Sequence, residues 1–342
     1  MDARRLHAFG LALSLLLFAA VALSEPSREA TPNADVGSGA SCTLEGKAEP
    51  RANAPIVDAN GRVLARFSGA PTPLVVHSLP EHASGLARIS TGTGTGSFRL
   101  HGFLAIREIP IYARTPIAVT ADHLWLAPGS RLEFVGARPG AVRVQKHLSG
   151  PFTQTVNTWA ACATLALAPV RQAWSPADGA LPYALRRPRL SIRARPYASA
   201  RSVITLVRAS DGGAGALFFV RERHGEWLHV EHRSELIVDG WVQRAELEAL
   251  PASKRLTEHT ADGTVPARLA VRGEPRVIKV AREVPFRQRA SELEPPIGVI
   301  EPEAEAYVLD RAPGWISVIP KALQVIPGGD GQFWVKASDL GL

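Results

Sequence analysis

The sequence predicts an all-β protein made of several small, similar units, and three observations support this fold class. The 342 residues include 29 glycines and 27 prolines, more than the average shares of about 7% and 5%, which indicates many turns. Short runs of β-branched or alternating residues, such as Ser202–Val207 and Arg276–Val280, are typical of strands. A pattern of tryptophan and leucine also recurs at domain-sized intervals, which is the mark of a repeat protein.

The composition excludes other classes of protein. Hydrophobic residues make up 46% and charged residues 21% of the chain, so it can bury a core and global disorder is excluded. The formal net charge is +7, and the most basic stretch is Arg186–Arg195. There the arginines alternate with Leu190 and Ile192, as in a strand with one solvated face. We therefore predict no nucleic-acid partner.

The N-terminus has the three parts of a secretory signal. Arg4 and Arg5 precede the uncharged apolar run Ala8–Leu23, and small residues at Ala22 and Ser24 suit cleavage near Ser24. An uncleaved anchor is the alternative, but the run is short against the roughly 20 residues that span a bilayer. We predict a signal peptide over residues 1–24, a flexible tether over 25–41, and a mature protein without a membrane span, periplasmic or secreted.

Cys42 and Cys162 are the two cysteines of the chain. Because disulfides form in exported proteins, we expect these two residues to be bonded to each other. No residue near Cys162 could activate it as a nucleophile.

A repeat of tryptophan and leucine divides the chain. Three tryptophans have a leucine six residues later: Trp159 with Leu165, Trp241 with Leu247, and Trp334 with Leu340. A second element, a turn followed by Trp-aliphatic-x-Val, begins at Trp227 and Trp315, and a degenerate form lies at 139–144. A fainter copy ends at Phe103-Leu104. With the Pro- and Gly-rich breaks, this predicts a disulfide-closed β domain over 42–170, with a diverged unit and a unit ending near 165, and further units over 183–252 and 266–342.

The order of these elements resembles bacterial SH3-like (SH3b) domains. The likeness is best from Leu190 to Leu250, where Gly240-Trp241-Val242 matches the closing strand of the family. The resemblance implies tandem small SH3-like barrels with a 3₁₀ segment before each closing leucine. It also implies a binding role, with cell-wall peptide or an envelope protein as partner.

Strand alternation separates the candidate ligand-binding residues from the structural ones. Leu228 and Val230 share one face of their strand, which leaves Trp227 and His229 on the other. The same argument applies to Trp315, so Trp227, His229 and Trp315 are the ligand-binding candidates. The alternative is that these tryptophans cover a neighbouring unit. We assign structural roles to the repeated tryptophans and leucines: Trp159, Trp241, Trp334, Leu165, Leu247 and Leu340.

No motif in the chain indicates catalysis or a cofactor. His224, His229, Glu231 and His232 do not converge when placed on a strand, so we predict no metal. The Gly-Thr stretch Ser90–Ser97 lacks the Gly-Lys-Ser/Thr ending of a phosphate-binding loop. We therefore predict an exported, non-catalytic binding or scaffolding protein with no cofactor. The alternatives are an envelope hydrolase with its site in residues 42–103 and a self-assembling structural module.

Overall fold

The computed structural model describes residues 42–92, 95–120, 122–149, 152–174, 180–208, 216–249, 276–328 and 332–341. Every regular element within these ranges is a β-strand or a short 3₁₀ segment, so the all-β prediction is confirmed. The expected signal peptide and tether lie outside the described residues, as do residues 250–275. In the ranges given above, no helix is long and apolar enough to cross a membrane.

The strands form four groups, which we call units 1 to 4 in chain order. Unit 1 contains β1 (Leu44–Ala48), β2 (Pro55–Val57), β3 (Val63–Phe67), β4 (Thr72–Ser78), β5 (Leu86–Thr91), β6 (Phe98–Ala105) and the 3₁₀ segment η1 (Ile106–Glu108). Unit 2 contains β7 (Ile111–Ala113), β8 (Ile117–Thr120), β9 (Leu124–Leu126), β10 (Arg131–Arg138), β11 (Ala141–His147), β12 (Thr155–Ala161), η2 (Cys162–Thr164) and β13 (Leu165–Ala166).

The second half of the chain forms two more groups of the same kind. Unit 3 contains β14 (Leu181–Leu185), β15 (Arg189–Arg193), β16 (Ser202–Val207), β17 (Leu217–His224), β18 (Trp227–Arg233), β19 (Leu236–Gln243), η3 (Arg244–Glu246) and β20 (Leu247–Ala249). Unit 4 contains β21 (Val277–Lys279), β22 (Val284–Phe286), β23 (Gly298–Ile300), β24 (Glu305–Ala312), β25 (Trp315–Pro320), β26 (Val325–Pro327), β27 (Phe333–Lys336) and η4 (Ala337–Leu340).

All four units share one strand plan. An opening strand pairs with the first strand of a three-stranded antiparallel meander, a hairpin lies between them in sequence, and a 3₁₀ segment follows the meander. In units 2 and 3 the chain then returns to pair with the opening strand, through β13–β7 and β20–β14. Residues 42–103, where the sequence repeat is faintest, have the same plan. The expectation of small barrels is corrected: among the described strands no sheet closes on itself, so the units are open sheets whose edges pair with neighbouring units.

Two local features mark the same places in the units. The first meander strand carries a β-bulge in every unit, at His77, Val135, Arg221 and Leu309. The turn after this strand has a glycine with positive φ in three units, at Gly140, Gly225 and Gly314. These three are the turn glycines of the repeat, and glycine suits them because it adopts positive φ without steric cost.

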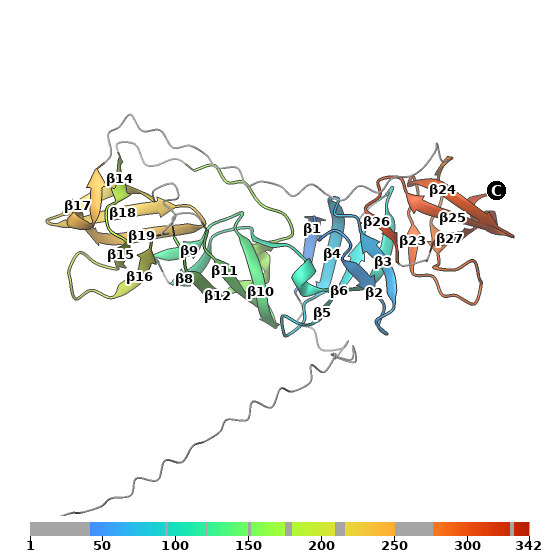
Figure 1. Ribbon diagram of the computed structural model, residues 1–342, viewed down its shortest axis with the longest axis horizontal. Coiled ribbons are helices and arrows are strands. Elements are labelled where there is room, and N and C mark those ends of the chain that lie inside the picture. Colours follow the sequence, from blue (N-terminus) through green and yellow to red (C-terminus); the bar gives the residue numbers. More distant parts are fainter. Residues whose placement is uncertain are drawn as a thin grey trace, which may run out of the picture.

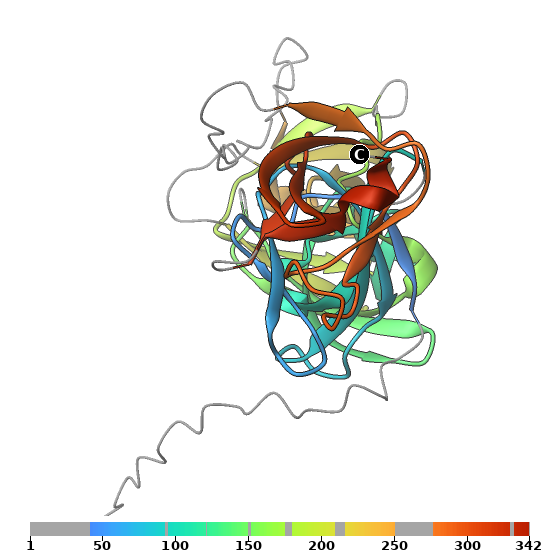
Figure 2. The same ribbon diagram turned by 90° about the vertical axis from the view of Figure 1, so that its right-hand side faces the viewer.

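The units form a row whose spatial order differs from their order in the chain (Figure 1). Unit 3 lies at one end, followed by unit 2, unit 1 and unit 4, and Figure 2 views this row from the unit 4 end. Unit 4 follows unit 3 in the chain but pairs with unit 1, because β23 bonds to β6 and β26 bonds to β3.

Two of the three junctions are built alike. At the junction of units 2 and 3, the second hairpin strand of unit 2, β9, pairs with the last meander strand of unit 3, β19. At the junction of units 4 and 1, β23 and β6 hold the same positions in their units. At each junction, the loop after the middle meander strand of one unit also pairs with the hairpin of the other unit. Phe152 of unit 2 pairs with Arg208 of unit 3, and β26 of unit 4 pairs with β3 of unit 1. A continuous sheet therefore crosses both junctions.

The third junction, between units 1 and 2, is covalent. Cys42 and Cys162 form a disulfide with a Cα–Cα distance of 5.6 Å, which confirms the predicted bond. Cys42 precedes β1 and Cys162 begins η2, so the bond joins the start of unit 1 to the end of the unit 2 meander. The two units are also joined by a hydrogen bond that the Ala137 amide donates to the Glu81 carbonyl over 3.2 Å.

Loss of the disulfide should destabilise units 1 and 2. The bond closes a loop with a sequence separation of 120, and a loop of about 100 residues contributes roughly 4–5 kcal/mol through the entropy of the unfolded chain. We expect Cys42→Ser with Cys162→Ser to lower the free energy of unfolding in urea by about that amount. Adding reductant should shift the wild-type midpoint and leave the double variant unchanged. Equal midpoints for the oxidised and reduced wild-type protein would contradict the prediction.

Gly240 should be intolerant of a side chain. A Cβ at this position would lie 2.6 Å from Ile192 Cγ2 and 3.0 Å from the Arg193 carbonyl, where the hairpin crosses β19. We expect Gly240→Ala to lower the free energy of unfolding by about 1–3 kcal/mol through overpacking. Thr205→Ala, an exposed change on the same hairpin, is the control and should stay within about 0.5 kcal/mol. An equally stable Gly240→Ala variant is the opposing outcome.

Candidate functional site

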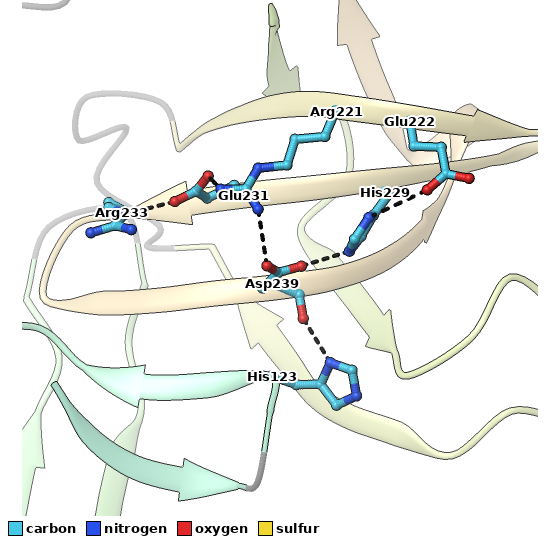
Figure 3. Close-up of polar contacts among 7 residues, drawn as sticks. All are labelled: His123, Arg221, Glu222, His229, Glu231, Arg233 and Asp239. Atoms are coloured by element: carbon cyan, nitrogen blue, oxygen red, sulfur yellow. Dashed lines mark hydrogen bonds and ion pairs between the residues drawn. The ribbon is translucent and has the colours of Figure 1, made fainter. Parts of the chain in front are cut away.

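Figure 3 shows a network of polar contacts on one face of the unit 3 meander. We call this the outer face of unit 3; it consists of Arg221, Glu222, Trp227, His229, Glu231, Arg233, Asp239 and Trp241. Strand alternation creates it, because Leu228 and Val230 of β18 point into the core and are fully buried. The bulge at Arg221 adds a residue to β17, and a bulge of this kind redirects a side chain.

Ion pairs connect the charged members of this face (Figure 3). Arg221 bonds to Glu231 and reaches Asp239 Oδ2 over 3.2 Å. Arg233 Nε donates to Glu231 Oε1 over 2.7 Å. Two arginines thus satisfy Glu231, which is only 3% exposed, and this agrees with the rule that buried carboxylates are paired.

His229 lies between two carboxylates. Its Nε2 is 2.6 Å from Asp239 Oδ1, and its Nδ1 is 3.9 Å from Glu222 Oε2. Burial raises the pKa of Asp239, but the hydrogen bond from His229 and the charges of His229 and Arg221 outweigh it and hold the pKa below its usual value. The Asp239 carbonyl also accepts a hydrogen bond from His123 Nδ1 of unit 2 over 2.9 Å, so this junction positions the face.

Two indoles lie beside the charges. The His229 ring stacks on Trp241 with the centroids 4.7 Å apart and the planes 10° apart. Trp241 lies directly opposite His229 in the strand register, and Trp227 is two residues before His229 on the same strand face. The structure therefore places the predicted Trp227 and His229 together and adds Trp241, which we had assigned to a structural role. Both indoles are partly buried.

Trp315 corrects a sequence prediction. It is 9% exposed, and all six residues of β25 are buried. The Arg287 guanidinium, which follows β22, lies 5.5 Å from the centre of its ring. Strand alternation places Trp315 on the face opposite Ile316 and Val318, but it does not indicate that the hairpin of unit 4 packs over that face. Trp315 is therefore a packing residue.

Trp159 is a second correction. We expected a structural residue, but its side chain is 42% exposed. Trp334 is partly buried, like Trp241. The leucines of the repeat behave as expected: Leu165 and Leu247 are buried, and Leu340 packs against the core.

One position of the last meander strand is aromatic in every unit. These residues are Phe103, Trp159, Trp241 and Trp334. The residues opposite them on the middle meander strand are Arg88, Arg143, His229 and Ser317. Three units thus place a basic residue opposite the aromatic one. The sequence repeat contained three of the aromatic residues, but only the register identifies their partners.

The groups on the outer face of unit 3 can bind charged ligands. Both ring nitrogens of His229 face carboxylates, and no hydroxyl or thiol contacts this ring in the described part of the chain. The same residues contain no group of three or more His, Cys, Asp or Glu that could hold a metal ion. The arrangement offers carboxylates, guanidinium groups and two indoles within a few residues of one another, which suits recognition of a ligand with both charges.

Residues 42–103, the alternative site for a hydrolase, contribute to a separate cavity. It measures about 390 Å³ and lies at the junction of units 1 and 4, with Asp58, His101 and Glu294 among its lining residues. Both carboxylates are already engaged: Asp58 accepts two backbone amide bonds, and Glu294 pairs with Arg62 over 2.8 Å. His77 Nε2 lies 2.9 Å from Ser90 Oγ, and burial followed by the charge of Arg88 lowers the pKa of His77.

The chain has no recognisable relatives in two comparisons. No protein-family model matches it, and no curated protein matches it.

His232 should make stability depend on pH. It is 3% exposed between Phe152 of unit 2 and Phe218, and burial lowers its pKa from 6.5 to about 4. The unfolded chain binds a proton below pH 6.5 while the folded protein does not, so stability is lost as the pH falls from 6.5 to 4. The loss attributable to His232 should be about 3 kcal/mol.

Urea unfolding at pH 7 and pH 4.5 measures this effect. His232→Gln should show a shallower pH dependence than the wild-type protein. The control is His147→Gln, an exposed histidine of unit 2, which should retain the wild-type slope. Identical slopes for the wild type and His232→Gln would contradict the assignment.

Proposed function

We propose that the protein is an exported, non-catalytic binding or scaffolding protein with tandem SH3-like domains, and that it recognises cell-wall peptide or an envelope protein. The observation that carries the proposal is the outer face of unit 3, where charges of both signs lie beside Trp227 and Trp241. A short peptide carries amino and carboxylate groups together with apolar side chains. Glu222, whose side chain is 63% exposed, suits an amino group, Arg221 can donate the N–H groups that do not face Asp239 and Glu231 to a carboxylate, and the indoles suit the apolar parts.

The strand plan supports the SH3-like part of the proposal. In unit 2 the strands pair in the order β13, β7, β10, β11, β12, and in unit 3 in the order β20, β14, β17, β18, β19. In both units the last strand along the chain pairs with the opening strand, and a 3₁₀ segment comes directly before that last strand. A 3₁₀ segment at this place is one feature that the SH3b resemblance implies, and it supports the proposal. The hairpins and turns are where the units differ, and such connections commonly carry function.

Export rests on the N-terminal sequence and on the disulfide. A basic start, an apolar run and small residues at Ala22 and Ser24 are what a secretory signal requires. The Cys42–Cys162 bond is compatible with an oxidising compartment, where such bonds persist. We propose the periplasm or the exterior of the cell as the site of action.

The row of units supports a scaffolding role. Strand pairing joins units 3 and 2 and units 1 and 4, and a disulfide joins the middle pair. Such a row holds binding surfaces at fixed separations, and this raises avidity for a polymeric or repeated target.

Co-sedimentation with isolated cell-wall sacculi tests the proposal. The mature protein should be retained, and Trp227→Ala with His229→Ala should reduce retention by about tenfold, as expected when residues at the centre of an interface are removed. Tyr197→Ala is the matched control, because Tyr197 is an aromatic residue of the same unit that is 45% exposed outside this face. It should bind like the wild type.

Two outcomes would reject the cell-wall version. One is no retention of the mature wild-type protein, and the other is equal retention of the double variant and the wild type, with folding verified by circular dichroism. Sedimentation velocity without sacculi addresses the self-assembling alternative, which requires a mass that grows with concentration. Hydrolysis of the sacculi by the wild type, abolished by His101→Ala, would favour the hydrolase alternative.

A further inference from the structure

Unit 2 presents an exposed aromatic and basic surface that the proposed function does not use. We call it the Trp159 face; it consists of Arg138, Arg143, Gln145, Asn157 and Trp159 on the meander of unit 2. The Arg138 guanidinium carbon lies 4.2 Å from the centre of the Trp159 ring. Arg143 lies directly opposite Trp159 in the strand register, so its side chain shares the same face.

The Trp159 face differs in charge from the outer face of unit 3. The positions of Asp239 and Glu231, which neutralise Arg221 in unit 3, correspond in strand register to Asn157 and Gln145 in unit 2. Both are neutral amides, and neither Arg138 nor Arg143 has a carboxylate partner among the described residues. Residues 106–174 contain seven lysines and arginines and three acidic residues. The same strand positions thus hold balanced charges in unit 3 and unpaired positive charges in unit 2.

Most neighbouring side chains are neutral hydrogen-bonding groups, and the exposed carboxylate of Glu133, opposite Gln145 in the register, pairs with His147 over 3.4 Å. His147 Nδ1 lies 2.6 Å from Thr155 Oγ1, and His147 Nε2 lies 2.7 Å from Gln145 Nε2. Asn157 and Thr155 continue the row beside Trp159 along β12, and both are exposed. Amides and hydroxyls both donate and accept hydrogen bonds, so this row matches a ligand rich in hydroxyl groups.

We propose that the Trp159 face binds an acidic polysaccharide. The C–H face of a sugar ring packs on the exposed part of the indole, a ring carboxylate pairs with Arg138 and Arg143, and the sugar hydroxyls bond to Asn157 and Thr155. Two unpaired guanidinium groups beside an exposed indole require an anion with an apolar face. A peptide of glutamate alone supplies the anion but not the hydroxyl groups. This ligand and this surface differ from those of the proposed peptide site, so either can fail without the other.

Isothermal titration of the mature protein with polygalacturonate tests the proposal. The wild type should bind, and more weakly as salt is added, because the contact is ionic. Trp159→Ala and the double variant Arg138→Gln, Arg143→Gln should each weaken binding about tenfold, equivalent to about 1.4 kcal/mol. Trp159→Phe, which preserves an aromatic ring, should retain most of the affinity.

A charge-matched variant separates a site from general attraction. Arg114→Gln with Arg171→Gln removes the same charge from exposed positions of the same unit and should change affinity less than twofold. An equal loss in this control would overturn the proposal, as would no binding of polygalacturonate to the wild type. Equal binding of poly-glutamate would overturn the assignment to a polysaccharide. Co-sedimentation of the Trp159→Ala variant with sacculi tests only the proposed peptide site on unit 3, because that site does not include Trp159.

Discussion

The pairing of strands across unit boundaries is the interaction on which the rest of this structure depends. A small open sheet has edge strands whose backbone amides and carbonyls need partners, and an unpaired edge is a site of uncontrolled association. Here the hairpin of one unit covers the last meander strand of another, through β9 on β19 and β23 on β6. The same pairing covers an edge and sets the spacing of the units, so the four form a row.

The two equivalent junctions explain why the chain order and the spatial order differ. Units 2 and 4 each offer a hairpin, and units 1 and 3 each receive one. The receiving strands contain Gly102 and Gly240, where the hairpin of the same unit crosses so closely that a Cβ would contact its backbone. The corresponding residues of the donor units are Thr158 and Phe333. The pairing of unit 4 with unit 1 is thus the same interaction that joins unit 2 to unit 3.

One surface position serves different chemistry in different units. The aromatic residue of the last meander strand stacks with His229 in unit 3, lies beneath Arg138 in unit 2 and faces a cavity of about 460 Å³ in unit 4. The shared strand plan places these aromatic side chains at the same position of each unit. The neighbouring residues decide whether the charges beside the aromatic ring are paired and whether the ring is exposed or covered. A repeat of this kind can vary its ligands without altering its fold.

The sequence by itself determined the fold class, the disulfide and three of the four repeats, because alternation, turn glycines and two cysteines are local or pairwise signals. It also placed Trp227 and His229 on one strand face. It could not distinguish Trp315 from Trp159, since the exposure of each depends on which distant hairpin covers it. Only the tertiary structure decided that Arg287 lies over Trp315, that Trp159 is exposed, and that unit 4 contacts unit 1. The physical reason is that alternation specifies which side chains share a face, whereas contacts between residues far apart in the chain decide which faces remain open.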